Sequence, residues 1–146
     1  IEVAGGFLEN GLEPGDRVGI HAGVRSEWAV VDMACHLAGL VSVPVSKLFD
    51  EQRAAHVVAA AGVDPLVVDR DPPESVRKVP DDIVRIDDLP TGRPARLPGL
   101  SAEPDDVATV LYRIGTAEHP NGCALTNRNL RAAVEMLSLA LPLDAG

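Results

Sequence analysis

Short apolar runs alternate along the chain with longer segments in which apolar residues recur every three or four positions. The runs at residues 17–22, 41–45 and 66–69 have the length of buried strands, and segments 27–40 and 51–61 have helical periodicity. Strand, helix, strand, helix, strand at this spacing calls for right-handed crossovers between parallel strands. The pattern therefore predicts an α/β fold, with a layered, mostly parallel sheet and flanking helices.

Cap residues mark the ends of the predicted helices. Residues 1–10 are typical of the tail of a helix that Gly11 closes, because glycine readily adopts the left-handed conformation at a helix C-terminus. Ser26 and Asp50 are placed to N-cap the next two helices, and Gly62 stops the second of them. The first of these two helices is expected to bury one face, made of Trp28, Val31, Cys35 and Ala38.

The pattern changes at residues 71–104, which contain seven of the twelve prolines and many charges, with one expected strand at 83–86. A linker is one interpretation, but a surface excursion within one domain fits better, because ordered apolar segments resume on both sides. A strand at 107–111 and a final helix follow, and Thr126 or Asn127 is expected to cap that helix. Its apolar face would include Val134, Leu137 and Leu141.

Length and charge restrict the class of protein. The 146 residues, 46% of them hydrophobic, fit one domain with an aliphatic core, and the net charge of −9 without a cationic block argues against nucleic-acid binding. The longest apolar stretch, residues 28–45, contains Asp32 and His36, whose burial in hydrocarbon would be costly, so no transmembrane segment is expected. The chain starts at Ile1, without Met, and ends at Gly146, so we expect a piece of a longer protein.

Isolated reactive residues give little support for a catalytic or metal site. Cys35 and Cys123 are far apart, which predicts two reduced, buried thiols in a cytoplasmic protein. His21 is expected to be a structural histidine near a strand end. Asp32 and His36 are four residues apart on one helix, but no third metal ligand is evident, so a helix-surface pair is expected.

The stretch between the last predicted strand and the last helix lies where an α/β protein places a phosphate-binding turn. It reads Tyr112-Arg113-Ile114-Gly115-Thr116-Ala117-Glu118-His119-Pro120-Asn121-Gly122. The segments around it, together with Trp28, resemble in order and spacing the N-terminal part of an AMP-binding, adenylate-forming acyl-CoA synthetase, closest to fatty-acid–CoA ligases. These segments are residues 15–20, 38–44, 104–112 and 122–130.

The resemblance implies that this stretch corresponds to the loop that wraps the ATP phosphates, which reads Tyr-Thr-Ser-Gly-Thr-Thr-Gly-x-Pro-Lys-Gly in the family. Gly115 and Thr116 would then hold phosphate oxygens, and Gly122 would allow the tight turn. No catalytic residue is assigned, because the resemblance implies that the family's catalytic lysine lies in a later segment that this chain lacks, and no metal ligand is assigned either. The chain keeps five positions of the family loop: Tyr112, Gly115, Thr116, Pro120 and Gly122.

The remaining positions of the loop weaken phosphate binding. Ile114 and Ala117 lack the hydroxyl groups that the family has at these positions. Each missing hydroxyl would contribute a hydrogen bond of about 0.5–1.5 kcal/mol to phosphate binding. Glu118 adds a carboxylate where the family has glycine, and Asn121 lacks the positive charge of the family's lysine. Arg113 could supply a positive charge, although the sequence leaves its direction open. A plain surface loop and a loop with residual nucleotide binding are both consistent with these substitutions.

The resemblance implies a function for a longer parent protein. Its family uses ATP and Mg²⁺ to activate a carboxylic (fatty) acid as an acyl-adenylate and then transfers the acyl group to CoA. Residues 1–146 would form a single partial domain, resembling the N-terminal subdomain of these ligases and inactive by itself, with an apolar edge prone to self-association. The alternatives are a degenerate, non-catalytic domain that serves as a binding or assembly module, and a flavodoxin-like ligand-binding domain.

Overall fold

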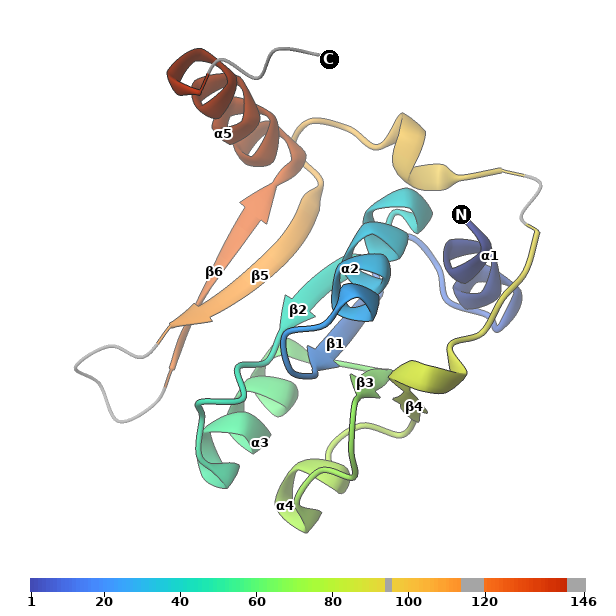
Figure 1. Ribbon diagram of the computed structural model, residues 1–146, viewed down its shortest axis with the longest axis vertical. Coiled ribbons are helices and arrows are strands. Elements are labelled where there is room, and N and C mark those ends of the chain that lie inside the picture. Colours follow the sequence, from blue (N-terminus) through green and yellow to red (C-terminus); the bar gives the residue numbers. More distant parts are fainter. Residues whose placement is uncertain (94–95, 114–119, 142–146) are drawn as a thin grey trace.

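In the residues that the computed structural model describes, 1–93, 96–113 and 120–141, six strands form one sheet in the order β4-β3-β1-β2-β5-β6 (Figure 1). The strands are β1 (Arg17–His21), β2 (Val41–Pro44), β3 (Leu66–Val68), β4 (Ile83–Arg85), β5 (Val107–Arg113) and β6 (Asn121–Thr126). The α-helices are α1 (Glu2–Glu9), α2 (Ser26–Ala38), α3 (Glu51–Ala61), α4 (Glu74–Arg77) and α5 (Asn127–Ala140). Strands β1 to β5 pair in parallel, and only the β5–β6 pair is antiparallel. The predicted fold class is therefore confirmed.

Helices cover both faces of the parallel part of the sheet. On one face, α1 and α2 pack against β1 through a core cluster that includes Phe7, Val31 and Ile20. On the other face, α3 and α4 pack against β2 and β3 through a second cluster that includes Val57 and Val43. Both clusters are almost entirely aliphatic, as the composition indicates, because short branched side chains fill closely spaced α/β layers.

The predicted helix ends are mostly confirmed. Asp50 caps α3, since its Oδ1 accepts a hydrogen bond of 2.8 Å from the backbone N–H of Arg53, and Gly62 follows α3 with φ of 60°. Ser26 is wrong as an N-cap: Arg25 holds that position, and the Ser26 hydroxyl donates instead to Glu27. The predicted buried face of α2 is confirmed for Val31, Cys35 and Ala38, which are fully buried, whereas Trp28 is only half-buried.

Residues 71–104 add an edge to the sheet. Strand β4 pairs in parallel with β3, and Val76 of α4 and Ile86 are both buried. Two 3-10 helices, η1 (Ile86–Asp88) and η2 (Pro98–Ser101), lie in the same stretch. The strand expected at 83–86 is thus present as β4. That the chain forms a single partial domain with a surface excursion at residues 71–104 stays a prediction.

The end of the chain differs from the prediction. Residues 121–126 form β6, which turns back antiparallel along β5, where we expected an irregular loop leading directly to a helix. Helix α5 then begins as expected, because the Thr126 hydroxyl and the Asn129 side chain form a reciprocal capping box. Figure 1 shows this hairpin and α5 standing to one side of the helices that cover β1.

Two further observations bear on the sequence predictions. Cys35 is buried, and burial raises the pKa of its thiol, as expected for an inert cysteine. Cys123 is exposed on β6, so the prediction that both thiols are buried is wrong for this residue. Across the described parts of the chain, none of the helices has both the length and the apolar character needed to cross a membrane.

Candidate functional site

The antiparallel hairpin carries the residues at both ends of the candidate phosphate loop. Tyr112 pairs with Gly122, and Arg113 pairs with Asn121, at the tip of the β5–β6 ladder. The predicted site residues Gly115 and Thr116 lie outside the described residues, as do Ile114, Ala117, Glu118 and His119. Of the three predicted cofactor-binding residues, the structure therefore places only Gly122.

A packing contact explains why position 122 is glycine. A Cβ atom at Gly122 would lie 2.8 Å from Cζ and 3.1 Å from the hydroxyl of Tyr112, which is too close for any larger residue unless the ring moves. The half-buried Tyr112 also packs against the core cluster beneath α3. Gly122 thus lets the Tyr112 ring lie flat across the hairpin, which fixes the tip of the hairpin relative to the sheet.

The two sides of the hairpin tip have different chemistry. Paired residues of an antiparallel ladder project from the same face, and neighbouring pairs project from opposite faces. Tyr112 and Gly122 therefore share the face that meets the core, while Arg113 and Asn121 share the other face, where both are exposed. The sequence leaves the direction of Arg113 open, and the structure places Arg113 beside Asn121, which stands where the resembled family has lysine.

A hydrogen bond from a β5 side chain attaches β5 to β2, and a second hydrogen bond continues from β2 to α2. The buried Thr109 donates from Oγ1 to the Ser42 carbonyl at 2.9 Å, and Ser42 donates from Oγ to Asp32 Oδ1 at 2.6 Å. The β2–β5 register contains only one pair, Ser42 and Thr109. This short chain of hydrogen bonds therefore reinforces a narrow connection between the hairpin and the parallel sheet.

Asp32 continues this chain of contacts to His36. Its Oδ2 lies 3.7 Å from His36 Nε2, and both side chains are about a quarter exposed, at 26% and 25%. Burial alone would raise the pKa of Asp32, but the nearby His36 and the hydrogen bond from Ser42 outweigh it and hold the pKa below its usual value. The predicted Asp32–His36 pair is confirmed, and within the described residues no group of three metal-ligating side chains occurs.

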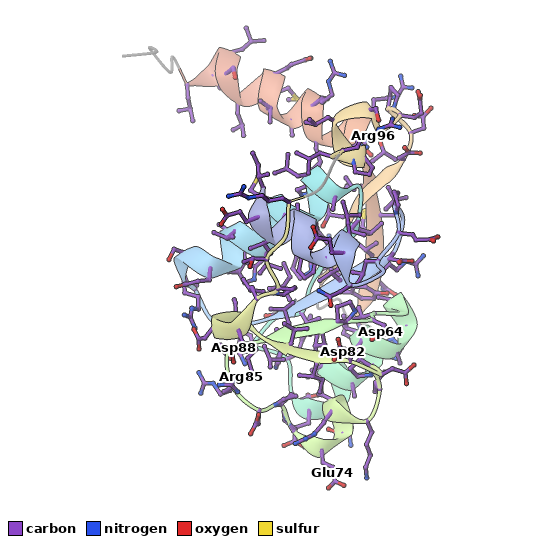
Figure 2. The ribbon with its side chains drawn as sticks, turned by 90° about the vertical axis from the view of Figure 1, so that its right-hand side faces the viewer. Asp64, Glu74, Asp82, Arg85, Asp88 and Arg96 are labelled. Atoms are coloured by element: carbon purple, nitrogen blue, oxygen red, sulfur yellow. The ribbon has the colours of Figure 1, made fainter. Side chains whose placement is uncertain are left out.

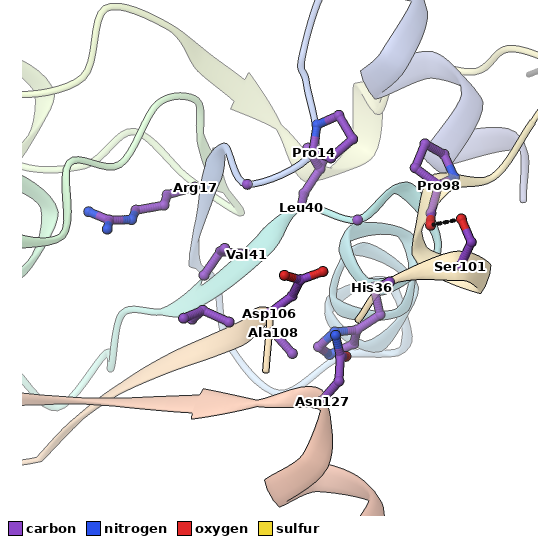
Figure 3. A pocket seen from close by; sticks show the side chains of 14 residues that line it. Pro14, Arg17, His36, Leu40, Val41, Pro98, Ser101, Asp106, Ala108 and Asn127 are labelled. Carbon is purple, nitrogen blue, oxygen red and sulfur yellow. Dashed lines mark hydrogen bonds between the residues drawn. The ribbon is translucent and has the colours of Figure 1, made fainter. Parts of the chain in front are cut away.

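A cavity of about 450 Å³ opens at the amino ends of β1, β2 and β5 (Figure 3). Its lining includes His36, Asp106 and Asn127, while Arg17 at its edge points away and donates to the Ala61 carbonyl at 2.6 Å. The volume suits a small ligand. Ligands of open α/β sheets, however, bind at the carboxyl ends of the strands, and the Asp106 carboxylate would repel phosphate. The cavity is thus a poor candidate for a nucleotide site.

Charged and polar groups that the sequence did not single out meet at the carboxyl ends of the strands. Asp69, after β3, accepts a hydrogen bond from the Gly23 N–H at 2.8 Å, and Lys47 Nζ lies 2.8 Å from its other oxygen. Burial opposes ionisation of Asp69, but Lys47 and the Gly23 amide outweigh it and lower the pKa to about 2. Asp69 directly follows β3, and Gly23 and Lys47 come two and three residues after the ends of β1 and β2, which is the available sequence signal.

His21 belongs to the same edge and has a structural role, as expected. Its Nδ1 lies 3.1 Å from the Val45 carbonyl, so the neutral tautomer with a proton on Nδ1 joins the ends of β1 and β2. Burial is the main cause of the lowered pKa of His21, because the charged form loses hydration. Lys47 and the Gly23 amide both contact the Asp69 carboxylate, and the cluster therefore joins the segments that follow β1, β2 and β3.

Comparisons with known proteins agree with the architecture. The profile of a protein family described as "AMP-binding enzyme" matches residues 2–144. A long-chain-fatty-acid–CoA ligase of Mycobacterium bovis is 30% identical over 150 residues, covering 86% of this chain and 24% of the relative. A 4-coumarate–CoA ligase-like protein of Oryza sativa subsp. japonica is 32% identical over 144 residues, covering 92% of this chain and 26% of the relative. The chain thus spans about a quarter of the length of these curated relatives.

Solved structures give the same result for the fold. The o-succinylbenzoate CoA synthetase of Bacillus subtilis, in complex with an acyl-adenylate intermediate, has a TM-score of 0.82 at 19% identity, covering 99% of this chain and 38% of that one. An N-terminal subdomain of NpsA from Klebsiella oxytoca has a TM-score of 0.69 at 26% identity, covering 86% of this chain and 33% of that one.

Proposed function

Since the chain belongs to the AMP-binding enzyme family, we propose that it supplies the N-terminal frame of a CoA ligase. The complete ligase would activate a carboxylic acid, in the first instance a fatty acid, with ATP and Mg²⁺ in the cytoplasm. The carboxylate attacks the α-phosphate of ATP, which gives an acyl-adenylate and pyrophosphate, and the thiol of CoA then displaces AMP. This chain alone does not complete either step.

The β5–β6 hairpin is the observation that carries this proposal. It holds Tyr112 and Gly122 across from each other at the two ends of residues 114–119, in which Gly115 and Thr116 are proposed to contact phosphate oxygens. Packing of Tyr112 fixes the described ends of the hairpin, and a fixed frame supports phosphate binding because preorganised donors contribute most to it.

The positive charge opposite the phosphates is proposed to come from Arg113. Asn121 stands where the resembled family has lysine, and Arg113 is its exposed partner in the ladder, with Cβ atoms of such pairs about 4.5–5.5 Å apart. An arginine can form two parallel hydrogen bonds to a phosphate, so it is suited to replace the missing lysine. Nucleotide binding by this chain is nevertheless expected to be weak, because Ile114, Ala117 and Glu118 remove further donors or add negative charge.

Titration calorimetry with ATP and Mg²⁺ on this chain tests the proposal. The wild type is expected to bind with a Kd weaker than about 100 μM. Asn121→Lys should strengthen binding about tenfold and Arg113→Ala should weaken it about tenfold, as one charge-assisted phosphate contact contributes about 1.4 kcal/mol. Arg77→Ala is the control, because Arg77 is exposed on α4, outside the hairpin. Unchanged affinity in both hairpin variants would contradict the role of Arg113.

The substitutions in the loop favour a second candidate, a non-catalytic binding or assembly module that keeps the fold. It predicts that neither the wild type nor Asn121→Lys binds ATP. In a longer protein that contains this chain, it also predicts no acid-dependent exchange between ATP and pyrophosphate, whereas the ligase proposal predicts that exchange. Wild-type binding at low micromolar concentration would contradict this second candidate.

A further inference from the structure

The order of the strands places a topological switch point between the neighbouring strands β1 and β3. The chain leaves β1 through α2, on one face of the sheet, and continues to β2 on one side of β1. It leaves β3 through α4, on the other face, and continues to β4 on the opposite side. The segments that follow these two strands therefore diverge at the carboxyl ends, and open α/β sheets usually bind their ligands at such a point.

A side chain of the protein itself spans the switch point. Asp69 follows β3, and its Oδ2 accepts a hydrogen bond of 2.8 Å from the N–H of Gly23, which follows β1. The other oxygen, Oδ1, is buried, and cations hold it without an aligned hydrogen bond, since Lys47 Nζ lies 2.8 Å away and Arg70 Nε 3.6 Å away. The Asp69 side chain is only 12% exposed, so its carboxylate lies inside this cluster and not on the surface.

The contacts of the Asp69 carboxylate are those of a bound oxyanion. Backbone N–H groups and ammonium groups are donors that proteins use for carboxylate and phosphate oxygens, and such charge-assisted contacts are stronger than neutral ones. A Cβ atom added to Gly23 would lie 3.4 Å from Asp69 Oδ2, so the carboxylate lies directly against this backbone. The segments after β1 and β2 thus supply the donors of an anion site, and the segment after β3 supplies the anion.

Two arginines at the same edge of the sheet also have partners within the chain. Arg25 Nη2 lies 2.6 Å from Asp87 Oδ1, and Arg85 Nη1 lies 3.3 Å from Asp71 Oδ1. Arg85 also donates to the Asp69 carbonyl at 3.0 Å, which fixes the backbone that carries the carboxylate. Figure 2 shows Arg85 far from α5, in the half of the molecule that contains α4. An external anion would therefore meet cations that carboxylates of the chain already neutralise.

We propose that Asp69 is an internal anion ligand, whose carboxylate occupies an oxyanion site at the switch point between β1 and β3 and keeps external anions out of it. The site suits a small carboxylate, because the Gly23 N–H and the Lys47 ammonium contact one oxygen each. The inference requires no nucleotide and goes beyond the proposed ligase function. The two can fail separately, because one is measured by the effect of formate on stability and the other by ATP binding.

Vacating the site tests the proposal. Asp69→Ala removes the carboxylate group, which has the size of formate, and at neutral pH formate is expected to bind in its place with a Kd of about 10 mM. Because a ligand of the folded state stabilises it, about 100 mM formate should lower the unfolding equilibrium constant of this variant about elevenfold relative to the same concentration of NaCl. Urea unfolding followed by circular dichroism measures this ratio. If the variant is unfolded in buffer, formate but not NaCl should restore its helical signal.

Three control variants locate the bound formate. Asp69→Asn fills the space with an uncharged group of the same shape, so formate should stabilise it no more than NaCl does. Asp69→Ala combined with Lys47→Met lacks the ammonium group and should lose the response. Asp105→Ala is the matched control, because it also removes a carboxylate that pairs with an arginine, Arg128, but one whose side chain is 78% exposed. Formate should act on Asp105→Ala as it acts on the wild type.

Several outcomes would overturn the proposal. Equal effects of formate and NaCl on Asp69→Ala, whether it is folded or unfolded in buffer, would mean that the vacated position is not an anion site. An equal response of Asp69→Asn or Asp105→Ala would assign the effect of formate to the bulk solution. A wild type that responds as strongly as Asp69→Ala would show that Asp69 does not keep external anions out. A double variant that keeps the response would remove Lys47 from the site.

Discussion

The parallel sheet is largely buried, whereas β5, β6 and α5, which we call the hairpin unit, are largely exposed. Strands β1, β2 and β3 are buried at nearly every position, with helices on both faces. Strand β6 is exposed at its first four positions and α5 contains no fully buried residue, although both are rich in apolar side chains. The difference shows that an apolar pattern predicts burial reliably only where the elements that would pack against it belong to the described structure.

The two regions are joined at one place. Strand β5 belongs to both, since it pairs with β2 at a single register position and with β6 at six. Thr109 lies at that joint and donates a buried hydrogen bond to Ser42. The hairpin unit therefore depends on the parallel sheet for its position, while the parallel sheet has its own two core clusters. Three substitutions test this asymmetry.

The largest effect is expected in the core of the parallel sheet. Ile20→Ala removes a fully buried side chain of β1 and should lower the free energy of unfolding by about 3 kcal/mol, through lost burial and a residual cavity. Leu139→Ala on α5 is the matched control, because Leu139 is 89% exposed, and it should change stability by about 0.5 kcal/mol or less. Urea unfolding followed by circular dichroism measures both free energies of unfolding. Equal losses of stability in the two variants would contradict the difference between the parallel sheet and the hairpin unit.

A smaller effect is expected at the Lys47–Asp69 ion pair. Asp69→Asn leaves Lys47 without its counter-charge at a site where the Asp69 side chain is only 12% exposed, and should destabilise the fold by about 2 kcal/mol. The control in the hairpin unit is Asp105→Asn, whose ion pair with Arg128 is exposed at 78% and 65%, and it should cost about 0.5 kcal/mol or less. Equal losses in the two variants would contradict the prediction.

The same pair gives the fold an acid dependence of known sign. The pKa of Asp69 is lowered to about 2 in the folded chain, from 3.8. The unfolded chain therefore binds the proton first as the pH falls, so the stabilisation from Asp69 is complete above about pH 4 and is lost between about pH 4 and 2. Wild type should lose stability in this window more steeply than Asp69→Asn, as measured by urea midpoints at each pH.

Elements of the parallel sheet could be predicted from the sequence more fully than those of the hairpin unit. Helix α3 between Asp50 and Gly62, and the order of strands and helices around it, could be predicted because cap residues and periodicity are local signals. Strand β6 could not, since Gly122 and Asn121 favour a turn and only the Tyr112 ring explains the glycine. The Lys47–Asp69 pair joins residues 22 positions apart, and no local pattern predicts such a contact.

The candidate site was predicted in part for a similar reason. Position 122 is placed by the structure, while Gly115 and Thr116 lie outside the described residues, so their roles stay predictions. The proximity of Arg113 and Asn121 depends on the register of the β5–β6 ladder, which no local sequence pattern supplies. Family resemblance identified the motif, and the hairpin supplied the geometry of the described residues on either side of it.

The smallest effect on stability is expected at the joint, where it separates the two regions most directly. Thr109→Val keeps the shape of the side chain but removes its donor to the Ser42 carbonyl, which should cost about 1 kcal/mol. Because β2 and β5 share only one register pair, this loss should fall mainly on the hairpin unit. Hydrogen exchange should then accelerate at β5 and β6 amides while β1 and β3 amides change little. Thr109→Ser retains the hydroxyl and should exchange like the wild type. Uniform acceleration across all six strands would mean that the sheet opens as one cooperative unit, and the distinction between core and hairpin would then describe burial but not stability.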